Sequence, residues 1–94
     1  MRLTESEKAT IKAVISGFDP QARVYLFGSR VDDTRRGGDI DLLIMSDVLS
    51  ASDRGTIGWE LCGKLGEQKI DIMIAQDTTD PFVEIAYKTG EQLQ

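Results

Sequence analysis

The chain has 94 residues, 40% of them hydrophobic, and its 11 basic and 16 acidic side chains give a formal net charge of -5. This length predicts one domain over residues 1–94 that is stable without disulfide bonds. The acidic balance argues against direct binding to nucleic acid, which normally requires a basic surface.

Signals for export and for membrane insertion are absent from the sequence. Residues 1–12 are polar and charged, which does not fit a secretory signal, and no apolar run approaches the roughly 20 residues of a membrane span. The single cysteine, Cys62, cannot form an internal disulfide, so we expect it to pack as a small apolar residue. These features predict a soluble cytoplasmic protein with no membrane partner.

The first half of the chain predicts one helix and two strands. Thr4 and Glu7 form a capping-box pattern ahead of apolar residues at helical spacing, which predicts a helix from Thr4 to Ser16 that ends at Gly17. Short apolar runs then predict strands over residues 23–27 and 40–45.

The second half predicts a helix, a strand and a last helix. The first of these helices covers residues 52–65 and stops at Gly66, with an inner stripe made of Ile57, Leu61, Cys62 and Leu65. A strand over residues 70–75 follows, and Asp80-Pro81 begins a last helix that carries Phe82, Ile85 and Ala86 and ends at Gly90. Together these elements predict an α/β (α+β) fold, a single small domain with a mixed β-sheet of three or more strands flanked by helices.

Three aspartates interrupt the apolar strand segments. Asp39 and Asp41 are two residues apart, so a strand would point both at one face, where two carboxylates repel unless they share a proton or a cation. Asp71 interrupts a second strand and would be a third ligand or a general base. Because an ionised carboxylate in a buried strand is costly without a cation, and the chain has no histidine, we expect Mg²⁺, or Mn²⁺, rather than Zn²⁺. The alternative is an Asp-x-Asp pair on a half-exposed edge strand or in a turn.

The turn after the strand over residues 23–27 predicts a phosphate site. Gly28 permits a close backbone approach, and Ser29 can cap a short helix. Free backbone N–H groups, the serine hydroxyl and the helix dipole would then surround phosphate oxygens. With the aspartates, this predicts a metal-dependent nucleotide site.

The segment Leu26-Phe27-Gly28-Ser29-Arg30, followed by Asp39-Ile40-Asp41-Leu42-Leu43-Ile44, resembles the Gly-Ser…Asp-x-Asp signature of the DNA polymerase beta-like nucleotidyltransferase superfamily. The small size is similar to that of the minimal nucleotidyltransferases, or MNT proteins, including antitoxin-type members that accompany a small helical HEPN protein. The resemblance implies metal binding by Asp39, Asp41 and Asp71. It also implies phosphate binding by Gly28 and Ser29, and we expect Arg30 or Arg36 to add positive charge at the leaving group.

The resemblance further implies a function in a toxin–antitoxin system. The expected reaction is Mg²⁺-dependent transfer of a nucleoside monophosphate, AMP from ATP or the equivalent from another nucleoside triphosphate, to an acceptor hydroxyl on a partner such as a HEPN toxin. Two alternatives stay open. The first is a non-catalytic antitoxin that acts by association, favoured by the unusual Val31-Asp32-Asp33 and by nine residues between Ser29 and Asp39 where many members have ten. The second is a small-molecule nucleotidyltransferase with a separate substrate-binding subunit.

A chain this small has little surface with which to select an acceptor. We therefore expect a partner protein or a second subunit to supply specificity, and a homo-oligomer is one such arrangement. Trp59 lies on the helix that contains several glycines. We expect it to pack in the core, with an interface anchor as the alternative.

Overall fold

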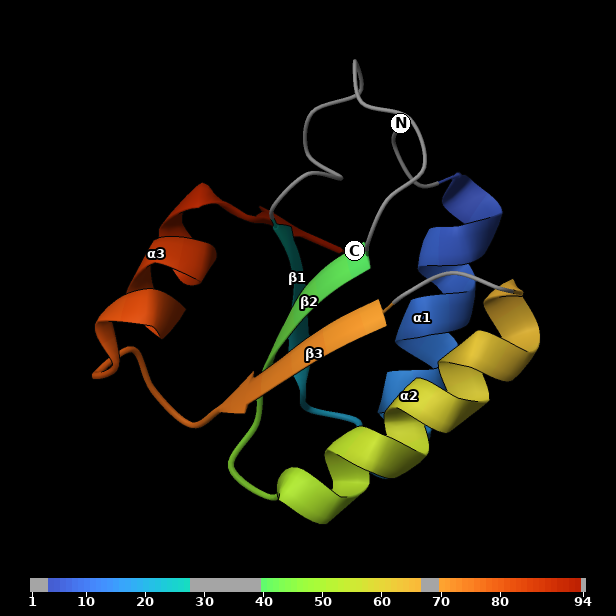
Figure 1. Ribbon diagram of the computed structural model, residues 1–94, viewed down its shortest axis with the longest axis horizontal. Coiled ribbons are helices and arrows are strands. Elements are labelled where there is room, and N and C mark those ends of the chain that lie inside the picture. The colour runs from blue at the N-terminus through green and yellow to red at the C-terminus, as the bar shows by residue number, and fades with distance from the viewer. Residues whose placement is uncertain (1–3, 28–39, 67–69, 94) are drawn as a thin grey trace.

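A four-stranded mixed sheet with strand order β3-β2-β1-β4 organises the chain in the computed structural model, which describes residues 4–27, 40–66 and 70–93 (Figure 1). The elements in chain order are α1 (Glu5–Phe18), β1 (Arg23–Phe27), β2 (Ile40–Met45), α2 (Ala51–Leu65), β3 (Ile70–Ala75), α3 (Pro81–Thr89) and β4 (Glu91–Gln92). This mixed sheet flanked by helices confirms the predicted fold class.

The strands β1, β2 and β3 match the predicted ranges to the residue. β2 pairs antiparallel with β1 and parallel with β3, so it is an interior strand of the sheet. Its side chains alternate between two apolar layers, as a strand period of two requires. Ile40, Leu42 and Ile44 pack with residues of α1 and α2, whereas Leu43 and Met45 pack with Val83 and Ala86 of α3. Figure 1 shows α1 and α2 together on one side of the sheet and α3 on the other.

Local hydrogen bonds explain where the helices begin and end. The predicted capping box of α1 is present, since Thr4 Oγ1 accepts a 3.1 Å bond from the Glu7 N–H while Glu7 Oε1 accepts a 2.8 Å bond from the Thr4 N–H. α1 continues through Phe18, past its predicted end, because Gly17 remains helical. α2 stops at Gly66, which has a φ of 87° that favours glycine. α3 begins at Asp80-Pro81 as predicted, with Asp80 accepting a bond from the Phe82 N–H.

The strand β4 was not predicted. It has only two residues, too few for an alternating pattern to be visible in the sequence. Its residues pair with Tyr25 and Leu26 of β1, and the Leu93 N–H then donates a 2.8 Å bond to the Val24 carbonyl. The Leu93 side chain is 1% exposed, so this segment closes one edge of the core.

Two expectations about α2 were wrong. Trp59 is 81% exposed rather than buried, and Cys62 is exposed rather than packed in the inner stripe. The fully buried residues of the helix are Ile57 and Leu61, one turn apart. At 100° per residue, Trp59 lies about 200° around the helix from Ile57 and therefore faces away from the sheet. No helix among the described residues is both long and apolar enough to cross a membrane.

An aromatic pair joins α3 to the sheet. The rings of Tyr25 and Tyr87 have centroids 5.0 Å apart with an interplanar angle of 58°, a tilted geometry favourable for aromatic side chains. Tyr25 is buried, and this burial raises the pKa of its hydroxyl above the ordinary value of 10.0, with a further increase from its hydrogen bond to Tyr87.

Because of this raised pKa, the free energy of unfolding depends on pH in the alkaline range. The native state favours the neutral phenol of Tyr25, so the unfolded chain releases this proton first as the pH rises through about 10, and the free energy of unfolding falls above that pH. We expect Tyr25→Phe, which keeps the ring, to show a smaller loss of stability between about pH 9 and pH 11. Urea denaturation across this range measures the slope. Equal slopes in the variant and the parent would contradict the assignment.

Candidate functional site

The structure describes two of the residues predicted to form the site. Asp41 lies near the start of β2 and Asp71 near the start of β3. The other predicted residues, Gly28, Ser29, Arg30, Arg36 and Asp39, lie outside the described part of the chain.

Asp41 and Asp71 are direct partners in the parallel ladder between β2 and β3. Neighbouring strands are about 4.8 Å apart, and paired residues point to the same face, so the two carboxylates are neighbours although they are distant in the sequence. Alternation along each strand puts Asp41 on the same face as Leu43, and Asp71 on the same face as Met73. This is the face that α3 partly covers, because Leu43 and Met73 belong to the apolar layer beneath that helix.

The two carboxylates differ in exposure. Asp41 is half-buried, beside Phe27 of β1 in the antiparallel register. Asp71 is exposed, because β3 is an edge strand whose other residues are only partly buried. The expectation that all the aspartates would be costly because of burial is therefore wrong for Asp71, and an exposed carboxylate of this kind can meet a substrate from solvent.

The chemistry of the pair suits a hard cation. Two adjacent carboxylates repel each other, and a shared divalent cation with oxygen ligands relieves that repulsion. Within residues 4–27, 40–66 and 70–93, no group of three or more His, Cys, Asp or Glu side chains is placed to hold a metal ion. Asp39, the expected third ligand, is not among these residues, so the described pair is part of the predicted set.

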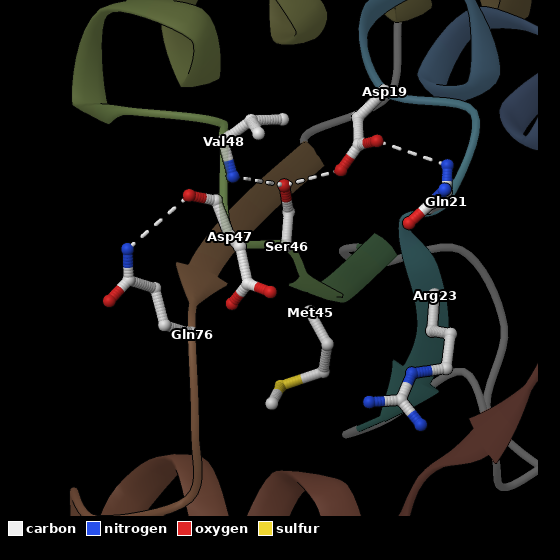
Figure 2. Close-up of a pocket in the computed structure, with 8 residues that line it drawn as sticks. All are labelled: Asp19, Gln21, Arg23, Met45, Ser46, Asp47, Val48 and Gln76. Carbon is white, nitrogen blue, oxygen red and sulfur yellow. Dashed lines mark hydrogen bonds between the residues drawn. The ribbon is translucent and has the colours of Figure 1, made fainter.

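A polar pocket lies at the other end of β2 from the carboxylate pair, beyond Met45. The residues that line it are Asp19, Gln21, Arg23, Met45, Ser46, Asp47, Val48 and Gln76 (Figure 2). From Asp41 to Ser46 the chain advances five residues, or about 17 Å at the usual rise of a strand. This pocket is therefore separate from the carboxylate pair.

The buried polar groups of this pocket bind one another. The Ser46 hydroxyl donates a 2.6 Å bond to Asp19 Oδ2 and accepts 3.1 Å bonds from the N–H groups of Val48 and Leu49. Asp19 Oδ1 accepts a 3.0 Å bond from the Gln21 N–H, as Figure 2 also shows. These hydrogen bonds connect the turn before β1 to the loop after β2, so we assign Asp19 and Ser46 a structural role. Sequence analysis did not single them out, because one serine after a strand is an ordinary feature.

We expect Ser46→Ala to destabilise the fold. The change leaves the buried Asp19 carboxylate without its hydroxyl donor and two N–H groups without their acceptor, at a cost of about 1–3 kcal/mol. Thermal unfolding measures the loss, and Ser16→Ala on the exposed face of α1 is the matched control, expected within about 0.5 kcal/mol of the parent. Equal melting temperatures for the two variants would contradict the structural role.

A family model described as Polymerase beta, Nucleotidyltransferase matches residues 9–94. A comparison with curated proteins gave no match. The match to the family model spans the whole sheet, including both described aspartates.

Solved structures share this fold. A chain in the crystal structure of a toxin–antitoxin complex with AMP-PNP is 24% identical with a TM-score of 0.77, covering 98% of this chain and 73% of that chain. A chain in the MntA–HepT toxin–antitoxin crystal structure is 19% identical with a TM-score of 0.73, covering 97% and 72%. A chain in the complex of tri-AMPylated Shewanella oneidensis HEPN toxin with MNT antitoxin is 20% identical with a TM-score of 0.73, also covering 97% and 72%. At these identities the likeness concerns the fold.

Proposed function

The chain belongs to the polymerase beta nucleotidyltransferase family, and from this premise we propose that it transfers AMP from ATP to a hydroxyl of a partner protein in a Mg²⁺-dependent reaction. The observation that carries the proposal is the placement of Asp41 and Asp71 as direct partners on one face of adjacent strands. Oxygen ligands of this kind suit Mg²⁺. The complex of tri-AMPylated HEPN toxin with MNT antitoxin contains a chain of similar fold, and this supports a HEPN-type partner.

Each proposed residue has a role in positioning or charge. Asp39, Asp41 and Asp71 would hold the metal, which when bound neutralises phosphate charge and orients the triphosphate. Gly28 and Ser29 would bind phosphate oxygens, and Arg30 and Arg36 would add positive charge near the departing pyrophosphate. The acceptor oxygen forms a bond to the α-phosphorus as the bond to the bridging oxygen of pyrophosphate breaks. Asp71, the exposed carboxylate, is suited to receive the proton of the acceptor hydroxyl.

The first test is calorimetric titration of ATP with and without Mg²⁺. We expect Mg²⁺-dependent binding that is weakened about 10- to 100-fold by Asp41→Asn and by Asp71→Asn, and lost in the double variant Asp39→Asn plus Asp41→Asn, because each change removes a charged ligand. GTP, CTP and UTP titrations give the nucleotide preference. Asp47→Asn is the matched control, since Asp47 is exposed at the other end of β2.

The outcomes separate the proposal from its failure. ATP binding that requires Mg²⁺, that is unchanged in Asp47→Asn and that is weakened in the Asp41 and Asp71 variants would support the site. Unchanged binding in Asp41→Asn would contradict the role of that carboxylate. No binding of any nucleotide by the folded parent chain would contradict the nucleotidyltransferase function.

A second candidate function is neutralisation of a partner by association alone. The exposed Trp59 favours it, because a tryptophan on an exposed helix surface is a common anchor of protein interfaces. On this account Trp59→Ala would weaken partner binding about 30-fold or more, whereas Asp41→Asn would leave neutralisation intact. Co-expression with a HEPN-type partner, scored by growth and by co-purification, distinguishes the two. Loss of neutralisation in Asp41→Asn with unchanged co-purification would exclude the association account.

A further inference from the structure

The outer edge of β3 is open among the described residues. β3 stands at one end of the strand order and has a described neighbour, β2, on one side only. Edge strands present unpaired backbone N–H and C=O groups, and natural proteins often protect them with lysine or proline. The segment Ile70–Ala75 contains neither residue. An extended segment of another chain can therefore continue the sheet at this edge.

A cavity of about 350 Å³ lies beside this edge, between β3 and one flank of α2. The residues that line it are Arg54, Gly55, Gly58, Ile70, Asp71 and Ile72. Because Gly55 and Gly58 have no side chains, this flank of the helix leaves space beside the strand. A Cβ added at Gly58 would lie 3.7 Å from Ile72 Cδ1, whereas a Cβ at Gly55 would meet nothing within 4 Å. Larger residues here would fill the space next to the strand.

A cationic side chain lines the same cavity, and an exposed aromatic side chain lies one helical turn away on α2. The side chain of Arg54 is exposed, and the described residues give it no ion-pair partner. Trp59 follows Gly55 by one helical turn and is 81% exposed. The cavity thus has a cationic group in its wall, whereas the carboxylate of Asp71 lies on the opposite face of β3, with Met73.

We propose that this edge is the docking site for the acceptor, which binds as an extended protein segment added to the sheet beside β3. The inference rests on the proposed function and deepens it, because it names the form in which the acceptor hydroxyl arrives. An extended segment is the occupant because it alone can pair with a row of edge backbone groups. Alternation then points the hydroxyl-bearing residue to the face of Asp71 and points both its neighbours toward the cavity. One of these neighbours is acidic and faces Arg54.

The test is calorimetric titration of short extended peptides into the parent chain. The probes are synthetic hexapeptides Thr-Val-Glu-Tyr-Val-Thr and Thr-Val-Tyr-Glu-Val-Thr, which cover both strand directions, and Thr-Glu-Val-Tyr-Val-Thr, in which glutamate and tyrosine share a face. We expect one of the first two to bind with a heat signal that saturates. The third should bind at least about tenfold more weakly.

Two variants on α2 locate the site. Gly55→Leu fills the cavity and should weaken peptide binding at least about tenfold, whereas Gly63→Leu, on the outer face of the same helix, should leave it unchanged. Arg54→Glu should reverse the preference, so that a peptide with lysine in place of glutamate binds better. Circular dichroism checks that each variant is folded.

The outcomes distinguish this inference from the proposed function. Calorimetry with ATP and Mg²⁺ should be unchanged in Gly55→Leu, while transfer of labelled AMP to the peptide is lost. Peptide binding with the expected preference and variant effects, but without AMP transfer, would support the docking site and contradict the proposed function. A parent chain that binds ATP but none of the hexapeptides, or equal hexapeptide binding by the parent and Gly55→Leu, would overturn the docking site.

Discussion

The parallel pairing of β2 with β3 is the constraint on which the rest of the molecule depends. It makes Asp41 and Asp71 direct neighbours, and it places residues of β3 in the apolar layers on both faces of the sheet. A shift of one residue in this register would move every side chain of β3 to the opposite face. Because Ile72 and Ile74 pack against the core beneath α1 and α2, the apolar pattern protects the register that the carboxylates require.

The sequence predicts much of this fold but only part of the site. Apolar runs bounded by turn residues predict β1, β2 and β3 to the residue, because burial of β-branched side chains dominates there. The exposure of Trp59, Cys62 and Asp71 was not predictable in the same way, because it depends on which helix flank and which sheet edge lack a neighbour. The pairing of Asp41 with Asp71 is a long-range contact that periodicity does not encode. Carboxylates that interrupt apolar strands, together with the family resemblance, predicted the set of Asp39, Asp41 and Asp71, and its metal-binding role stays a prediction.

The two ends of β2 have opposite characters. Near its start, Asp41 stands beside an exposed carboxylate on the edge strand. After its end, the Ser46 hydroxyl and the Asp19 carboxylate are buried and bonded to each other. Polar groups satisfied internally contribute to stability, whereas exposed carboxylates remain available to ligands. The same strand therefore separates a region suited to rigidity from a region suited to chemistry.

The crossover from β2 through α2 to β3 has a consequence for folding kinetics. Parallel strands cannot pair until the intervening helix has crossed over the sheet, so their contacts are non-local and are slow to form. The two carboxylates meet only when this crossover closes. Partly folded chains that lack the β2–β3 ladder therefore lack the close approach of Asp41 and Asp71, and a cation bound by both, as proposed, would stabilise the complete native state selectively.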